Sequence, residues 1–391
     1  MDSLTQLVLG SAVGVAVMGR RTAVWKAATW GAVAGTLPDL DALIDQGDAI
    51  LNMTRHRAET HSLVYLTLAA PLFAWLAAWL LGWRQALQEL RVGLPARPQP
   101  RLWSPLRPPL WPRWMLATWL IFITHTAIDA MTVYGTQLWL PFTRHPYGVG
   151  SIFIIDPAYT LPLLFGLLVV LFRKGHAGLR WNVAGLVLST AYMGWSVVAQ
   201  QHVTRVVQAS LQAQGISAKR VLVTPSPFNT VLWRVVVMTP TQYLEGFHSL
   251  LDEPQAPAAT SEAPAARHLI AWRAYDRGAQ WLDTHGNNPG VQRIAAFSHG
   301  FYSLRAGGEN QDRLQITDLR MGQEPFYTFR FDVGPTDPAA ATHYRPLGPD
   351  EPQTPPSVLL RQRPDIATAL PWLWERLKGN QNVQAPWSSR Q

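Results

Sequence analysis

The chain of 391 residues contains no cysteine. Disulfide bonds and thiolate metal ligands are therefore excluded, and any metal ion must be held by His, Asp or Glu. The absence of cysteine fits an oxidising compartment. Acidic residues are scarce in the first half, because residues 1–200 contain 15 Lys and Arg against 9 Asp and Glu, whereas residues 201–391 contain 18 against 16. The net charge of +8 thus divides into +6 and +2.

The basic residues are not gathered into one soluble stripe with interleaved aromatic side chains. Because such a stripe is the usual footprint of nucleic-acid binding, we expect no nucleic-acid partner. The second half of the chain also lacks a nucleophile elbow, a P-loop and a dinucleotide-binding fingerprint. We therefore expect the chemistry of this protein to lie in the first half.

Long apolar runs are nearly confined to the first 200 residues, which we interpret as a polytopic α-helical membrane domain with about six spans. The first two spans are short and form a hairpin over residues 4–38, in which Gly and Ala allow the backbones to approach closely. The fifth span contains prolines and is expected to be kinked or to start late. The remaining spans are predicted at residues 62–81, 114–133, 152–172 and 181–198.

The rest of the chain reads as soluble. Residues 201–216 continue the last span as an amphipathic helical stem, and residues 217–391 are predicted to form a small α+β domain with a mobile insertion at 254–266. A terminal helix is expected at residues 366–378. Strands are expected at residues 220–224, 231–238, 268–272, 301–305, 313–317 and 326–331.

Basic residues fix the expected orientation in the membrane. Arg20, Arg21 and Lys26, six arginines between residues 82 and 113, and the basic residues at 173–180 all fall in loops on one face. The positive-inside rule makes that face cytoplasmic. The 38–61 loop, the 134–151 loop and everything after residue 200 are then expected on the periplasmic side.

Three pairs of ligand-type side chains are brought to a similar depth by this topology. Counting along the helices places them roughly 16–22 Å from the cytoplasmic edge, near the outer face. Mixed imidazole and carboxylate ligands suit a divalent ion, with Zn expected first and Mn or Fe as alternatives, and the set has room for one or two ions. The metal ligands predicted in this way are Asp39, Asp41, His56, His61, His125 and Asp129.

Each part of this set also has an ordinary interpretation. Asp39 and Asp41 can cap a helix, and His125 with Asp129 can form a buried hydrogen-bonded pair. Two neighbours are candidate catalytic residues: Arg57 as an anion clamp or else an interfacial anchor, and Glu59 as a general base or else a solvated carboxylate. A seventh candidate for the site is Asp156. The six ligand-type residues together favour a metal site.

At these residues the sequence resembles the YdjM-like family of bacterial inner-membrane proteins, which are regarded as metal-dependent hydrolases. The resemblance implies metal dependence, hydrolysis and the six positions named above. Many members of that family carry His where this chain has Gln6, and Gly followed by an apolar residue where it has Ala58 and Glu59. If Gln6 replaces a ligand, one metal position is weakened or absent. The matching stretches are residues 1–6, 35–41, 56–62, 125–129 and 134–142, and residues 225–234 resemble a longer branch of the family.

The sequence thus predicts an inner-membrane, metal-dependent hydrolase that acts at the periplasmic face on an amphiphilic ester or phosphoester. The bilayer and a lipid-like substrate are its expected partners, and the oligomeric state is left open. The alternative is a protein without enzymatic activity, either a metal-ion permease or a scaffold whose periplasmic domain binds a partner. A permease needs polar residues through the depth of the bilayer, and the inner halves of the last four predicted spans carry few.

Overall fold

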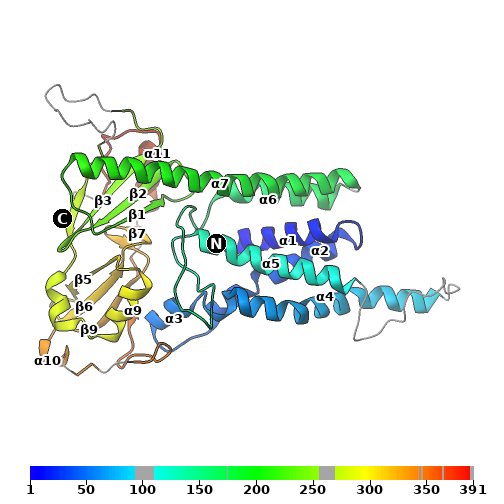
Figure 1. Cartoon of the computed structure of the whole chain (residues 1–391), viewed down its shortest axis with the longest axis horizontal. Coiled ribbons are helices and arrows are strands. Elements are labelled where there is room, and N and C mark those ends of the chain that lie inside the picture. The colour runs from blue at the N-terminus through cyan, green and yellow to red at the C-terminus, as the bar shows by residue number, and fades with distance from the viewer. Residues whose placement is uncertain are drawn as a thin grey trace.

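The protein consists of a helical N-terminal half and a β-rich C-terminal half that meet end to end (Figure 1). The computed structural model describes residues 1–92, 110–173, 175–254, 269–341, 343–344, 347–362 and 365–387. Its helices in the first half run side by side, and their near ends face the sheets. The elements of this half are α1 Ser3–Met18, α2 Val24–Thr36, the short 3-10 helix η1 Pro38–Leu43, α3 Ala49–Arg55, η2 Glu59–His61, α4 Leu63–Val92, α5 Trp111–Met131, α6 Pro157–Phe172 and α7 His176–Ala213.

Within the described residues, three helices are long and apolar enough to cross a membrane, namely α4, α5 and α7. The predicted count of six spans is not supported. Helices α1 and α6 are apolar but have 16 residues each, and α2 has 13. At 1.5 Å per residue, 16 residues reach about 24 Å, which is less than the roughly 30 Å of a hydrocarbon core. The predicted late start of the fifth span is confirmed, because α6 begins at Pro157 behind the capping residue Asp156.

The short hairpin predicted at residues 4–38 is formed by α1 and α2. Its two helices touch through backbone atoms, because a Cβ built on Gly10 would lie 2.2 Å from the carbonyl oxygen of Gly31. The same holds in reverse for Gly31 and the carbonyl oxygen of Gly10. Only glycine fits at this crossing, and the crossing fixes the position of η1, which follows α2 directly.

Helix α7 joins the two halves of the molecule. Its apolar membrane segment continues into the predicted stem without a break and ends at Gln214. One face of the stem is buried against strand β2, so α7 runs from the far end of the helical half across the sheet (Figure 1). The buried stem residues recur every four positions at Ala199, Val203, Val207 and Leu211.

The C-terminal half contains two four-stranded antiparallel sheets, of strand order β1-β2-β3-β4 and β10-β9-β6-β5, and a small hairpin of β7 and β8. Helices α9 and α3 cover the second sheet, and α11 lies beside the first (Figure 1). The strands are β1 Arg220–Pro225, β2 Leu232–Met238, β3 Gln242–Ser249, β4 Arg273–Asp276, β5 Tyr302–Gly307, β6 Arg313–Asp318, β7 Gly322–Gln323, β8 Phe326–Tyr327, β9 Arg330–Pro335 and β10 Val358–Leu359. The helical elements are η3 Ala279–Trp281, α8 Leu282–His285, α9 Pro289–Phe297, α10 Pro338–Ala341 and α11 Ile366–Leu377.

Most predicted strands have a counterpart, and two predictions are wrong in detail. The strand expected at 268–272 is displaced, because β4 begins at Arg273. The strand expected at 326–331 is divided between β8 and β9. The predicted terminal helix is α11. The insertion expected at 254–266 lies outside the described residues except for residue 254. The loop expected at 82–113 begins later than predicted, because α4 continues to Val92, and residues 93–109 lie outside the described residues.

The 38–61 loop of the helical half is built into the junction between the halves. Helix α3 of the 38–61 loop places Ile50 and Met53 in one apolar core with Val291, Ile294 and Phe331. The Asp48 carboxylate accepts hydrogen bonds from the backbone N–H and the hydroxyl of Ser357, 2.8 and 2.9 Å away. The C-terminal half therefore holds the loop that carries polar residues of the predicted site.

Candidate metal centre

Four of the six predicted ligands converge at the near end of the helical half. They are Asp39 on η1, His61 on η2, and His125 and Asp129 one turn apart on α5, and one ligand atom from each lies within 4.8 Å of all the others. Three of them are buried, and Asp39 has 18% of its side chain exposed. Access to the centre is therefore on the Asp39 side.

The imidazole of His125 turns its Nε2 lone pair toward this centre. Its Nδ1 lies 2.7 Å from the carbonyl oxygen of Gly35, at the end of α2. A carbonyl oxygen only accepts hydrogen bonds, so Nδ1 carries the proton in the neutral ring. Nε2 is then an acceptor, and it lies 3.1 Å from Nε2 of His61.

The ring of His61 is oriented in the same way. Thr60 donates its hydroxyl proton to Asp41 Oδ2 over 2.6 Å, so its oxygen is free to accept from His61 Nδ1, 2.9 Å away. In the neutral ring, Nε2 of His61 also presents a lone pair to the centre. Two facing lone pairs 3.1 Å apart repel each other unless a cation lies between them.

The two carboxylate oxygens of Asp129 have separate partners. Oδ1 accepts from Gln6 Nε2 at 3.0 Å, lies 3.4 Å from Arg57 Nη2 and also contacts the amino group of Met1. Oδ2 has no hydrogen-bond donor among the described residues, although it is buried. It lies 3.2 Å from His61 Nε2 and 3.5 Å from His125 Nε2. The cluster around Oδ1 thus leaves Oδ2 available to a metal ion.

These distances fit a single small divalent ion. A tetrahedral zinc ion with bonds of 2.0–2.1 Å separates its ligand atoms by about 3.3–3.4 Å. Nε2 of His61 lies 3.2 Å from Asp39 Oδ1, and Nε2 of His125 lies 3.7 Å from the same oxygen. Together with the distances given above, five of the six edges lie between 3.1 and 3.7 Å. Asp39, His61, His125 and Asp129 are therefore the residues that would hold such an ion.

Asp41 and His56 are not members of this group of four, although both were predicted as ligands. They pair with each other beside it, since His56 Nδ1 lies 2.8 Å from Asp41 Oδ1. Asp41 Oδ2 accepts from Thr60 and from the backbone N–H of Arg57. Burial raises the pKa of Asp41, but the hydrogen bonds from His56 and Thr60 lower it to about 2. Asp41 is therefore an ionised carboxylate that orients His56, and the His56 side chain is 23% exposed.

The two predicted catalytic residues have different surroundings. Arg57 is buried, donates from Nη1 to the hydroxyl of Thr132 at 3.1 Å and lies over the Tyr134 ring. It thus supports Asp129 from within the protein, and it is not an interfacial anchor. Glu59 is outside the group of four; its side chain is 43% exposed and pairs with Arg55 Nη2 at 2.9 Å.

The family model described as YdjM inner membrane protein matches residues 1–203, which is more than half of the chain. The chain belongs to the YdjM family of inner membrane proteins. No curated protein and no solved structure matches it significantly. The YdjM match contains all four residues of the group and ends within α7, so the β-rich half lies beyond it.

One departure from the YdjM pattern, Gln6, and the seventh candidate residue, Asp156, can now be placed. Gln6 lies beside the candidate ion site, where its amide holds Asp129 Oδ1 and its Oε1 has no hydrogen-bond partner among the described residues. It therefore positions a ligand. Asp156, the seventh candidate, caps α6 by accepting from the backbone N–H of Ala158, and it lies outside the group.

Sequence reasoning did not identify the supporting groups. Thr60 was part of a matching stretch, so its sequence position was a usable signal. Gly35 also lies in a matching stretch, but any residue supplies a carbonyl, so its position did not single out this group. Thr132 lies in none of the matching stretches. These groups became visible only through their distances to His125 and Arg57.

Proposed function

We propose that this member of the YdjM family is a membrane-embedded, metal-dependent hydrolase that acts at the periplasmic face of the inner membrane on an amphiphilic ester or phosphoester. The observation that carries the proposal is the group of Asp39, His61, His125 and Asp129, whose ligand atoms lie within 4.8 Å of one another. The outer atoms of His61, His125 and Asp129 are held by hydrogen bonds. Zinc is the first expectation, and one ion is the number that this group supports.

A divalent ion held there would polarise an ester or phosphoryl oxygen and lower the pKa of a water molecule toward neutrality. The protein supplies the remaining functions. Gly35 and Thr60 keep the two imidazoles in the tautomers that present Nε2, and Gln6 with Arg57 keeps Asp129 turned toward the centre. Asp39 is the partly exposed member of the group, so it would be the ligand on the side from which a substrate reaches the centre.

His56 is the group that we propose for proton transfer. Asp41 holds its Nδ1, which leaves the other ring nitrogen free to exchange a proton with a substrate or leaving group. The pair lies beside the metal centre, because the rings of His56 and His61 are 6.0 Å apart. This arrangement of an imidazole oriented by a carboxylate replaces the general-base role that we predicted for Glu59.

Exposed apolar side chains around the access side support an amphiphilic substrate. The apolar residue Leu40 lies between the two aspartates of η1, and Leu43 and Ile44 follow them. All three side chains are exposed, and that of Leu43 is 82% exposed. Phe142 in the 134–151 loop is likewise exposed. A lipid-like substrate would bury these apolar side chains, whereas a polar, water-soluble substrate would leave them in contact with water.

The orientation across the membrane is part of the proposal. The α1–α2 and α6–α7 turns lie at the end of the helical half that is remote from the sheets (Figure 1), and Arg20 Nη1 lies 3.2 Å from His176 Nε2 between them. Basic residues favour the cytoplasmic side. The metal centre and the C-terminal half then face the periplasm.

The function is tested with purified protein in lipid nanodiscs, loaded with one equivalent of zinc and given ester and phosphoester amphiphiles in turn. We expect turnover that stops on chelation and returns when zinc is restored. His56→Ala should retain zinc and lose about 10²–10⁴-fold in kcat. Absence of turnover on every substrate class by zinc-loaded protein would refute the hydrolase.

The alternative is a permease or scaffold without enzymatic activity. The same zinc-loaded preparation, reconstituted into proteoliposomes, distinguishes it. Zinc uptake that depends on His125, without hydrolysis, would establish transport in place of hydrolysis.

A further inference from the structure

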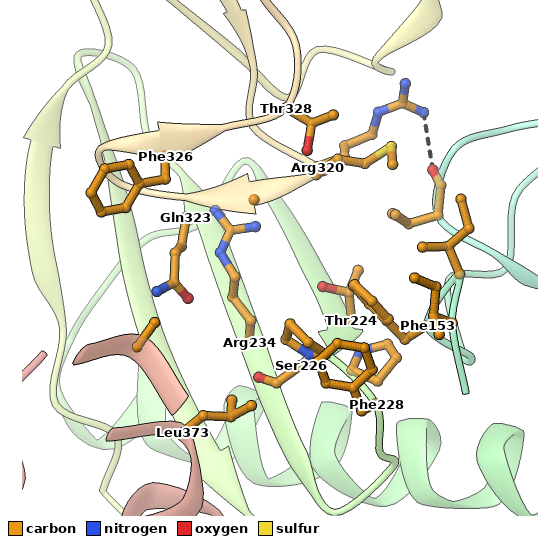
Figure 2. A pocket seen from close by; sticks show the side chains of 18 of the residues that line it. Phe153, Thr224, Ser226, Phe228, Arg234, Arg320, Gln323, Phe326, Thr328 and Leu373 are labelled. Carbon is orange, nitrogen blue, oxygen red and sulfur yellow. Dashed lines mark hydrogen bonds between the residues drawn. The ribbon is translucent and has the colours of Figure 1, made fainter. Parts of the chain in front are cut away.

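A cavity of about 610 Å³ lies between the two halves of the molecule, apart from the metal centre. Its walls come from the segment after α5, the β1–β2 loop, the β7–β8 hairpin and α11 (Figure 2). This volume falls in the range of roughly 300–1,000 Å³ that is usual for small-molecule sites. Most of the lining is apolar, including Ile152, Phe153, Phe228, Leu370 and Leu373.

Two buried polar groups in this apolar wall have no hydrogen-bond partner among the residues that the structure describes. The hydroxyl of Ser226 and the indole Nε1 of Trp372 form no hydrogen bond within the described part of the chain. Both residues are more than nine-tenths buried. The Ser226 hydroxyl is directed into the space between Arg234 and Leu373 (Figure 2). A buried donor without an acceptor is costly, so the pair indicates a ligand that brings acceptor oxygens.

The charged groups of the wall are already paired. Arg234 binds Glu245 through Nε at 2.6 Å, and Arg320 binds Asp318 through Nη2 at 2.7 Å. Neither guanidinium is therefore left to fix a strongly charged ligand. The cavity suits a long apolar body with one modest polar group.

The mouth of the cavity lies where the apolar surface of the helical half begins. Tyr192 of α7 bonds both to Asp156, the cap of α6, and to Thr230 of the β1–β2 loop, at 2.9 and 3.1 Å. The exposed ring of Phe228 packs against Phe153 at the edge of the loop. Phe228 has a φ of +68°, a left-handed conformation that bulky residues rarely adopt. The loop thus holds an aromatic side chain at the membrane end of the cavity.

One wall is shared with the surroundings of the metal centre. Thr132 and Tyr134 line the cavity, and they also contact Arg57. The Tyr134 ring lies 5.6 Å from that of His56. Thr132 and Tyr134 thus belong both to the wall of the cavity and to the surroundings of the metal centre.

We propose that this cavity binds one acyl chain of a membrane amphiphile, whose carbonyl oxygen accepts hydrogen bonds from Ser226 and Trp372. The chain reaches the cavity from the bilayer past Phe153 and Phe228. That this chain belongs to the substrate of the metal centre rests on the proposed function, whereas the binding itself needs no metal. Residues 225–234, which resemble a longer branch of the family and take no part in the metal centre, would form part of the wall and the mouth of this cavity.

The test is photocrosslinking of the full chain in nanodiscs of phosphatidylcholine that carries a diazirine in one acyl chain. We expect label in peptides that contain residues 224–228 and 366–373. Ala369→Trp fills the cavity and should lower this labelling about tenfold or more. Ala367→Trp, on the same helix but outside the lining, is the matched control and should label as the wild type does.

Ser226→Ala should weaken labelling by about 3- to 10-fold, as the loss of one hydrogen bond predicts. His125→Ala should label fully, because the cavity does not depend on the metal. Label confined to the membrane faces of the helices, or equal labelling of the two tryptophan variants, would overturn the proposal. Normal labelling without hydrolysis would refute the proposed enzyme and leave the acyl-chain site standing.

Discussion

At the scale of the residue, the candidate metal centre depends on atoms that face away from it. Asp129 presents Oδ2 to the centre because Gln6, Arg57 and the Met1 amino group take Oδ1. Such outer partners commonly change metal affinity by about 10–100-fold when they are removed. The centre is therefore best probed through a residue that is not itself a ligand.

Gln6→Ala should weaken zinc binding by about tenfold, because Asp129 Oδ1 loses one of its donors. Competition with a chromophoric chelator measures the affinity. Asn182→Ala is the control, since it removes another buried amide, which donates to the carbonyl of Ala12. Equal zinc affinity in the two variants would show that Gln6 has no role in holding Asp129.

At the scale of the element, the α1–α2 hairpin positions the centre. Gln6 lies on α1, and Asp39 follows α2 by three residues. The crossing of Gly10 and Gly31 leaves no room for a side chain. A change there must move both elements relative to α5.

Gly31→Ala should lower the thermal unfolding midpoint, at a cost of about 1–3 kcal/mol, and weaken zinc binding, because its Cβ would meet the Gly10 carbonyl oxygen at 2.2 Å. Gly194→Ala on α7 is the matched control, since a Cβ there meets no atom within 4 Å. It should be neutral or slightly stabilising. An unchanged midpoint in Gly31→Ala would contradict the close crossing.

Helix α11 is held on the first sheet by an ion pair that predicts a pH dependence. Asp252 accepts from Arg376 Nη2 at 2.7 Å. Burial raises the pKa of Asp252, but the hydrogen bonds from Arg376 and His248 lower it to about 2. Since its unfolded pKa is about 3.9, the stabilisation is complete above that pH and is lost as the pH falls toward 2.

The protection of the α11 amides, which is the intrinsic exchange rate at each pH divided by the observed rate, should therefore decrease between pH 5 and pH 2.5. Asp252→Asn should show lower protection than the wild type at pH 5 and should lose this additional acid dependence. The same decrease in protection in both proteins would mean that another group anchors α11.

At the scale of the whole molecule, the sequence predicted elements that depend on local patterns better than it predicted contacts between residues far apart in the chain. Apolar runs and glycine spacing located the hairpin, α5 and the stem of α7. The predicted number of six spans is not supported, because α1, α2 and α6 are shorter than a hydrocarbon core of roughly 30 Å. Strand β3 was missed because it carries polar residues such as Glu245, which is buried by its pair with Arg234 on β2.

The same contrast between local pattern and distant contact applies to the candidate metal centre. Residue type and depth predicted six ligands, of which four form the group. The pairing of the other two, His56 and Asp41, depends on how the 38–61 loop folds back. The cavity was not predictable, because its walls come from segments between residues 132 and 387 that only the tertiary fold brings together.

The absence of cysteine makes the membrane orientation directly measurable. Glu309→Cys places one thiol in the exposed β5–β6 turn, and Arg21→Cys places one in the α1–α2 turn. A membrane-impermeant maleimide applied to cells with a permeabilised outer membrane should label the first variant and reach the second only after lysis. The reverse pattern would put the metal centre on the cytoplasmic side.

The most direct test of the metal centre is the zinc content of purified protein, measured by inductively coupled plasma mass spectrometry. We predict one ion per chain in the wild type and in His56→Ala, and loss of that ion in His125→Ala and His61→Ala. Circular dichroism would verify that all variants are folded. Wild-type protein that binds no transition metal after incubation with zinc, or a folded His125→Ala variant with its ion retained, would contradict the account.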